Sequence, residues 1–264
     1  MFRGALQTPQ ICLACGAFAY LDFLARPFDP PPLPPAARAA DRHRARARLR
    51  AGAGALDEAS SLSLLEAWGV PTIPHIVAES SDEARLAAEK LGYPVACKTA
   101  SPGILHKSDV GGVRLGLADE HALLAAYGDL ATRLGPRALI APMAPRGVEL
   151  SLGMICDPQF GPIVTVGAGG VLVELLADRR AALAPFGRAT ARRLLDDLKL
   201  RRLLDGYRGG GAVDMDRLAE VVALFSVLAA ELADLIAEID VNPLVAGREI
   251  LALDALVVAK PEKS

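Results

Sequence analysis

The sequence is poor in aromatic residues and has no long apolar run. Aromatic side chains make up 5% of the 264 residues, so we expect an aliphatic core. No apolar run reaches the roughly 20 residues that a membrane-spanning helix needs, which argues against a membrane partner. The apolar stretch 11–21 is followed by Asp22 and by no convincing small-residue cleavage site, so a signal peptide is not expected.

The sequence also has few cysteines and a small net charge. Of the four cysteines, Cys12 and Cys15 form one C-x-x-C pair with no second pair or nearby histidine to complete a zinc site. We therefore interpret the cysteines as small apolar residues of a cytoplasmic protein. The net charge of −2 gives no electrostatic reason to expect nucleic acid as a partner.

Several common catalytic signatures are missing. The chain has no G-x-x-x-x-G-K-[ST], G-x-S-x-G or H-E-x-x-H motif, which excludes P-loop chemistry and two frequent kinds of hydrolase. The glycine-rich run Gly167-Ala-Gly169-Gly170 is followed by a strand-like pattern over 171–176. It therefore fails the context test of a dinucleotide-binding loop and is either a tight turn or a phosphate-contacting loop.

Residues 1–54 differ in character from the rest. A helical pattern over 11–24 runs into a proline-rich stretch, 28–35, and then into the arginine-rich segment 41–50. The arginines are compatible with a nucleic-acid arm, but a solvated helix or linker fits the balanced global charge better. With the flexible joint at 51–54, this region is predicted to be a tail and linker.

From residue 55 to 260 helical and strand patterns alternate. Helices are predicted at 57–68, 81–91, 120–134, 191–204 and 215–236, the last with a long apolar stripe. Strands are predicted at 73–78, 93–98, 113–117, 138–143, 148–155, 162–166, 171–176, 237–241 and 249–258, with the last two joined by a turn at 243–247. Antiparallel hairpins among alternating elements indicate an α+β (mixed α/β) fold in two lobes.

The segment Lys98–Val113 contains residues suited to phosphate chemistry. Lys98 ends a strand, where a fixed ammonium group can contact phosphate oxygens. Gly111 and Gly112 allow close approach of the backbone to a phosphate, and His106 lies between the lysine and the glycines. The alternative is a polar surface loop without a function.

A second group of polar residues lies near the C-terminus. Glu238, Asp240 and Asn242 alternate with apolar residues and so share one face of a strand, and Asp254 interrupts an apolar stretch. Carboxylate and amide oxygens are ligands that Mg²⁺ takes together with nucleotide phosphates. The alternative is a solvent-facing strand edge, although a buried Asp254 needs a partner.

In combination these motifs resemble the ATP-grasp domain of NDP-forming acyl-CoA synthetases, relatives of succinyl-CoA synthetase. The matching pieces, in order, are G-A-L-D-E-A (54–59), G-Y-P-V-A-C-K (92–98), S-P-G-I-L-H-K-S-D-V-G-G-V (101–113), G-V-E-L-S-L-G-M (147–154), D-P-Q-F-G-P (157–162), G-A-G-G-V-L-V-E (167–174), E-I-D-V-N-P-L (238–244) and A-L-D-A (252–255). They extend over about three quarters of the chain.

This resemblance implies a two-lobed fold that grips ATP or ADP between antiparallel sheets. It assigns Lys98, Gly111, Gly112, Ala141, Met143 and Glu149 to nucleotide binding, and Asp240, Asn242 and Asp254 to Mg²⁺. His106 would accept the phosphoryl group during interconversion of acyl-CoA and carboxylic acid. Positioning and charge neutralisation are the main contributions of a protein to phosphoryl transfer, and a neutral imidazole is a nucleophile near pH 7.

The chain also departs from the family. The complete enzymes contain a CoA-binding domain and a ligase domain with another phosphohistidine, and neither is recognisable here. The resemblance therefore implies a CoA-binding partner in a hetero-oligomer, or a homodimer, with residues 1–54 as the remnant of a preceding domain. Ala141-Pro142 replaces a frequent polar pair beside the base, and an arginine expected near position 182 is missing. The alternatives are a nucleotide-holding module without turnover, or another ATP-grasp ligase that works through an acyl phosphate.

Overall fold

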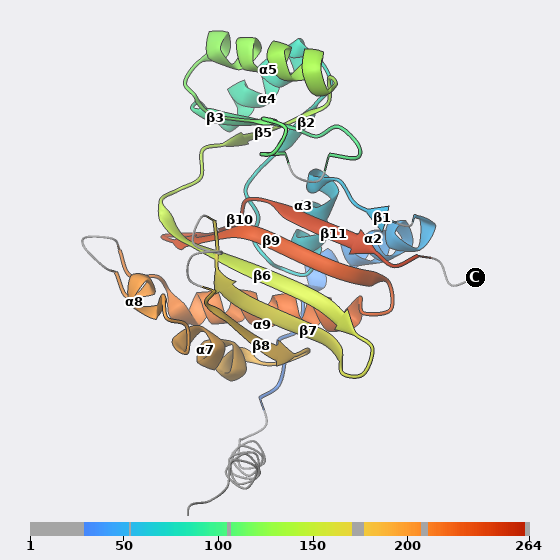
Figure 1. Cartoon of the computed structure of the whole chain (residues 1–264), viewed down its shortest axis with the longest axis vertical. Helices are drawn as coiled ribbons and strands as arrows, with labels where there is room; N and C mark the ends of the chain where they lie inside the picture. The colour runs from blue at the N-terminus through green and yellow to red at the C-terminus, as the bar shows by residue number, and fades with distance from the viewer. Residues whose placement is uncertain (1–28, 53, 105–106, 171–176, 207–210, 262–264) are drawn as a thin grey trace, which may run out of the picture. The chain divides into compact units, whose positions relative to one another are not determined.

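The computed structural model describes residues 29–52, 54–104, 107–170, 177–206 and 211–261. The chain divides into a short unit, 1–30, and a compact unit, 31–264. The helices and antiparallel sheets of the compact unit confirm the predicted α+β class (Figure 1).

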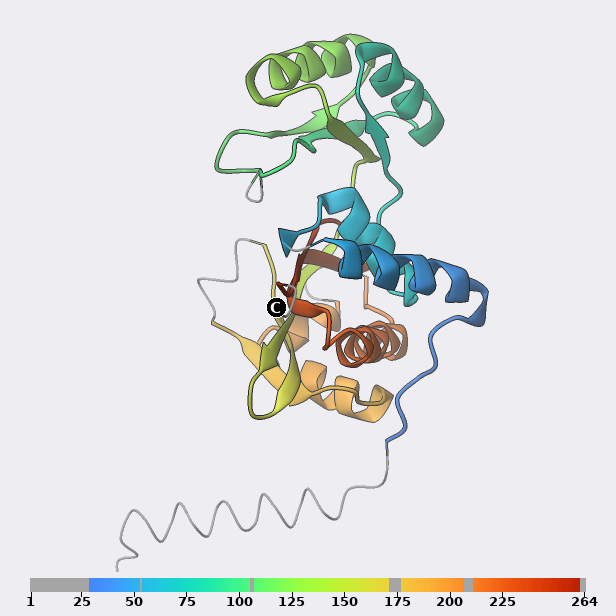
Figure 2. The same cartoon turned by 90° about the vertical axis from the view of Figure 1, so that its right-hand side faces the viewer.

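A four-stranded antiparallel sheet forms the smaller of two layers of strands. Its order is β2-β5-β3-β4, with β2 (Ile76–Ala78), β3 (Val95–Thr99), β4 (Val113–Leu117) and β5 (Ala138–Pro142). Helices α4 (Ser81–Leu91) and α5 (Glu120–Leu134) cover one face of this sheet (Figures 1 and 2). Both helices begin where a side chain accepts a backbone hydrogen bond, from Glu83 N to Ser80 and from Ala122 N to Asp119.

The larger sheet has seven antiparallel strands, in the order β1-β11-β9-β6-β7-β8, with β10 beside β9. The strands are β1 (Gly54–Ala55), β6 (Gly147–Asp157), β7 (Gly161–Ala168), β8 (Arg179–Leu183), β9 (Ile236–Gly247), β10 (Ile250–Ala252) and β11 (Ala255–Ala259). Helix α9 (Met215–Glu231) packs against α7 (Arg188–Asp196) and β7, and the short α8 (Arg201–Leu204) precedes it. The predicted stripe of α9 is buried, Leu218, Phe225 and Leu228 among it, in the main hydrophobic core.

The end of the large sheet differs from the prediction. Residues 243–247 were expected to form a turn, but they continue β9, which pairs with both β6 and β10. Proline lacks an N–H group and is tolerated in a strand where the pairing is irregular. The register between β6 and β9 shifts next to Pro243, between Leu150 and Leu152, and this irregularity accommodates it. The predicted strand 171–176 lies outside the described residues.

The arginine-rich segment belongs to the compact unit. Helix α2 (Ala39–Ala51) buries Leu49, while Arg42 donates to the carbonyls of Pro35 and Ala67. Arg46 donates to the carbonyl of Glu231 at the end of α9. Because these arginines bind backbone carbonyls, α2 is attached to the rest of the compact unit. The boundary at 54/55 between a tail and a domain stays a prediction.

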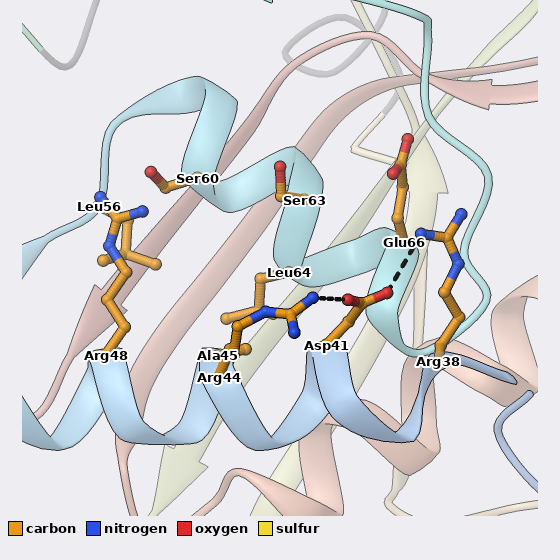
Figure 3. A pocket seen from close by; sticks show the side chains of 10 residues that line it. All are labelled: Arg38, Asp41, Arg44, Ala45, Arg48, Leu56, Ser60, Ser63, Leu64 and Glu66. Atoms are coloured by element: carbon orange, nitrogen blue, oxygen red, sulfur yellow. Dashed lines mark hydrogen bonds and ion pairs between the residues drawn. The ribbon is translucent and has the colours of Figure 1, made fainter. Parts of the chain in front are cut away.

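The outer side of α2 forms a groove of about 470 Å³ with α3 (Glu58–Ala67) (Figure 3). Arg38 and Arg44 both bind Asp41 there, while Arg46 and Arg48 pair with Asp234 and Asp57 outside the helix. Along the described part of the chain, no helix has both the length and the apolar character that crossing a bilayer requires.

Candidate active site

A cavity of about 670 Å³ lies between residues of the two sheets. Five of the residues that were predicted to bind a nucleotide or its metal line it: Lys98, Ala141, Met143, Glu149 and Asp254. The rest of the wall is mainly apolar, with Ile73, Leu115 and Val245 among its members. An apolar cavity with a few charged groups at its edge is the usual form of a small-molecule site.

Lys98 lies at the charged edge of this cavity and is held from two sides. Its Nζ is 2.7 Å from Oε1 of Glu58 and 2.8 Å from the carbonyl oxygen of Leu253. Glu58 is the first residue of α3, and its side chain is completely buried. A buried carboxylate is strongly disfavoured without a cationic partner, so Glu58 and Lys98 fix each other across 40 positions of the sequence.

A second lysine completes the charge cluster. Lys107 Nζ lies 2.9 Å from Oε2 of Glu58 and 3.3 and 3.2 Å from the two carboxylate oxygens of Asp254. Burial by itself lowers the pKa of Lys107, but the attraction of Glu58 and Asp254 outweighs it and raises that pKa above the ordinary value. Lys107 is therefore charged at neutral pH.

The pKa of Asp254 is also raised, which for a carboxyl group disfavours the charged form. Burial, followed by repulsion from Glu58, raises the pKa of Asp254, and Lys98 and Lys107 offset only part of this. Two carboxylates and two ammonium groups thus form one cluster, which we call the charge cluster: Glu58, Lys98, Lys107 and Asp254. The expected partner of Asp254 is present, and it is a lysine that was not assigned a role from the sequence.

The predicted metal ligands are brought together only in part. Asp240 and Asp254 line one small cavity of about 180 Å³, together with Ser108 and Asp109. Carboxylate oxygens suit Mg²⁺, so this pair fits the ion, with Lys107 supplying the positive charge beside Asp254 in this structure. The side-chain oxygen of Asn242 instead accepts a hydrogen bond of 3.0 Å from Gly170 N. Among the described residues, no three His, Cys, Asp or Glu side chains gather closely enough to form a metal site alone.

The glycines of the loop shape it and do not line the large cavity. Gly111 N donates to the carbonyl of Ser108, and Gly112 N donates to that of Lys107. A Cβ atom on Gly112 would lie 2.6 Å from the side chain of Thr99, so only glycine fits there. In this conformation both amides are used within the loop, and the predicted phosphate contact stays a prediction.

Further along β5 from the position that pairs with Lys98, the cavity wall is apolar at Ala141, Pro142 and Met143, and Arg146 and Glu149 also line the cavity. Met143 N donates to the carbonyl of Pro94, and the Met143 sulfur lies 3.1 Å from Gly116 N. Glu149 faces Gly170 so closely that a Cβ on this glycine would overlap its carboxylate. The positive φ of Gly170, 55°, also favours glycine at this position.

Two members of the charge cluster, Glu58 and Lys107, were not predicted as site residues. Glu58 lies in the motif 54–59 and Lys107 in the motif 101–113, so position within these motifs was the available signal. Their partners are distant in sequence, and no local pattern reveals such pairing. His106 lies outside the described residues.

The fold and site define an α+β protein in which two antiparallel sheets share one cavity with a charged edge. A family model described as "ATP-grasp domain" matches residues 47–258. The chain belongs to this family, which confirms the resemblance inferred from the motifs.

Proteins with similar sequences are ADP-forming acetate–CoA ligases. Acetate–CoA ligase [ADP-forming] I of Archaeoglobus fulgidus is 38% identical over 204 residues, which are 74% of this chain and 30% of that protein. The beta subunit of acetate–CoA ligase [ADP-forming] I of Pyrococcus furiosus is 35% identical over 212 residues, 77% of this chain and 91% of the subunit.

Among solved structures, the dinucleotide forming acetyl-coenzyme A synthetase 1 of Ca. Korarchaeum cryptofilum, in complex with coenzyme A and Mg-AMPPCP, has a TM-score of 0.71 and 32% identity. It covers 83% of this chain and 100% of that chain. By the coverages given above, this chain spans under a third of the Archaeoglobus ligase and nearly the whole length of the Pyrococcus subunit.

Proposed function

We propose that this chain is the nucleotide-binding subunit or domain of an ADP-forming acyl-CoA synthetase. It would transfer a phosphoryl group between ATP or ADP and His106 while acyl-CoA and carboxylic acid are interconverted. The observation that carries the proposal is the cavity of about 670 Å³ whose wall combines an apolar end at Ala141 and Met143 with Lys98 and Asp254 at its charged edge.

The two ends of this cavity suit the two ends of a nucleotide. The apolar end, near Met143, offers surface for a purine, and Lys98 offers a fixed positive charge for phosphate oxygens. Bound beside Asp240 and Asp254, Mg²⁺ would neutralise part of the phosphate charge. Glu58 orients Lys98 through the 2.7 Å contact between its Oε1 and the ammonium, which is a positioning role.

The proposed reaction is an exchange of one P–O bond for one P–N bond. An imidazole nitrogen of His106 attacks the terminal phosphorus of ATP, the bond to the bridging oxygen breaks, and ADP leaves. In the opposite direction ADP takes the phosphoryl group from the histidine. Residues 101–104 and Lys107, which lie on either side of His106 in the sequence, line a cavity of about 230 Å³ together with Asp254.

Relatives support a partner for this chain. The Pyrococcus protein is named as a beta subunit, and the Korarchaeum structures include coenzyme A. We propose that a CoA-binding subunit carrying another phosphohistidine supplies the acyl-phosphate step, in a hetero-oligomer with this chain.

The test is labelling of the full chain with γ-³²P-ATP and Mg²⁺, with and without ADP as a chase. Wild type, His106→Ala and the matched control His121→Ala, an exposed histidine on α5, are compared. The proposal predicts acid-labile, base-stable label in wild type and in His121→Ala, removed by ADP, and none in His106→Ala. Label that persists in His106→Ala, or no label in wild type, would contradict the assigned role of His106.

A further inference from the structure

Lys107 occupies a position that a cation at Asp254 would otherwise take. Its ammonium contacts both carboxylate oxygens of Asp254, at 3.3 and 3.2 Å, and its side chain is only 10% exposed. The same small cavity is lined by Asp240, the other carboxylate proposed to bind Mg²⁺. Lys107 thus places a positive charge directly on Asp254 within this cavity.

The two lysines of the charge cluster differ in how much they depend on Asp254. Lys98 is 4.0 Å from Asp254 and keeps two other partners, Glu58 Oε1 and the Leu253 carbonyl. Lys107 has two carboxylate partners, and its contact with Glu58 Oε2 at 2.9 Å does not involve Asp254. Lys107 can therefore leave Asp254 and remain paired with Glu58.

A divalent cation at Asp254 would repel the Lys107 ammonium, which contacts both oxygens of the same carboxylate. With Glu58 and Asp254 ionised and both lysines charged, the cluster is neutral, so an added divalent cation must displace charge or be weakly bound. We propose that Lys107 competes with the nucleotide-bound divalent cation for Asp254, and that binding of the cation transfers the Lys107 ammonium to Glu58 alone. This inference rests on the proposed function, because it requires a metal–nucleotide complex in this cavity.

The competition gives Lys107 a definite role as a positioning residue. Without metal it neutralises Asp254 in a partly buried environment, and with metal it limits the affinity of the site. Removal of its charge is then expected to strengthen metal binding. A lysine that simply contacts the phosphates would have the opposite effect.

The experiment measures Mn²⁺ binding to the ADP-saturated full chain by electron paramagnetic resonance of free Mn²⁺. ADP affinity is measured in parallel by calorimetry, once with Mg²⁺ and once with EDTA. Lys107→Met and Lys107→Gln remove the charge of Lys107, and Lys107→Arg keeps it. Lys90→Met, at an exposed position of α4, is the control. Circular dichroism confirms that each variant is folded.

We expect both neutral variants to bind Mn²⁺ about tenfold more tightly than wild type, the change that follows from losing one competing charge-assisted contact. This gain in affinity should require the metal and be absent for ADP in EDTA, and Lys107→Arg and Lys90→Met should resemble wild type. Unchanged or weaker Mn²⁺ binding in both neutral variants overturns the competition while leaving the proposed function intact. Absence of ADP binding to wild type, with or without metal, overturns both.

Discussion

Replacement of Glu58 by glutamine tests how strongly the charge cluster contributes to stability. The substitution keeps the size of the side chain and removes its charge, which leaves Lys98 and Lys107 with Asp254 as their remaining carboxylate in the cluster. At 2.7 and 2.9 Å, each ammonium–carboxylate pair has a gross Coulomb energy of about 6 kcal/mol at an effective dielectric constant of about 20. Most of this is offset by the cost of burying the charges.

The net cost of Glu58→Gln follows from the partners that remain. Breaking a buried ion pair costs about 3–5 kcal/mol. Because Lys98 keeps the Leu253 carbonyl and Lys107 keeps Asp254, we expect the lower end, about 3 kcal/mol. For a chain of this size that corresponds to a fall in Tm of about 6–12 °C.

Urea and thermal unfolding measure this change, with Glu89→Gln as the matched control. Glu89 forms an exposed i,i+4 pair with Arg85, and its loss should cost less than about 0.5 kcal/mol. In the double variant Glu58→Gln/Lys107→Met, removal of the ammonium that has lost its Glu58 partner should restore at least about 1 kcal/mol. A Glu58→Gln protein within about 0.5 kcal/mol of wild type would refute the reasoning.

Three further predictions concern other parts of the unit. Gly112→Ala should lower the free energy of unfolding in urea by about 1–3 kcal/mol, because the added Cβ would lie 2.6 Å from the Thr99 side chain. The control Gly128→Ala has open space in α5 and should raise it by about 0.5–1 kcal/mol. Equal effects of the two substitutions would contradict this prediction. Asp57 caps α3 through Ser60 N and pairs with Arg137; burial alone raises the pKa of Asp57, but these contacts lower it below the ordinary 3.8. Because the pKa of Asp57 is lower in the folded state, its ionised form stabilises the fold above pH 3.8, and this stabilisation is lost as the pH falls below that value. Asp57→Ala should therefore lower the free energy of unfolding by about 1–2 kcal/mol at pH 7 and by less at pH 3. The same difference at both pH values would contradict this prediction. Burial raises the pKa of the Cys97 thiol to about 12, so native alkylation at pH 8 followed by peptide mapping should modify the half-buried Cys156 and leave Cys97 unmodified.

Local signals predicted several regular elements well, but the helix expected at 191–204 is divided into α7 and α8, and the strand expected at 249–258 is divided into β10 and β11. Helix α5 and strand β4 have the bounds expected from the sequence, because Asp119 caps the helix and Gly135 ends it. In β9 the sequence signals were misleading: Pro243 and Gly247 are ordinary turn residues, and only pairing with β6 and β10 keeps them in a strand. The attachment of α2 was equally invisible, since its arginines bind carbonyls far along the chain.

The site was predicted where motif resemblance could assign residues one by one. Lys98, Ala141, Met143, Glu149 and Asp254 do share a cavity. Glu58 and Lys107 were missed as site residues because their contacts join positions up to 147 residues apart. Asn242 was predicted as a metal ligand from its place on a strand face, but its hydrogen bond from Gly170 depends on tertiary structure alone.

The most direct test of the account is calorimetric titration of ADP with Mg²⁺ into wild type, Lys98→Met and the control Lys90→Met. We expect one binding site in wild type and in Lys90→Met. In Lys98→Met the affinity should be about 10- to 100-fold weaker, the loss expected for one hydrogen bond to a charged group. Wild type that binds no ADP, or Lys98→Met that binds it as tightly as wild type, would contradict the claim that this cavity holds the nucleotide.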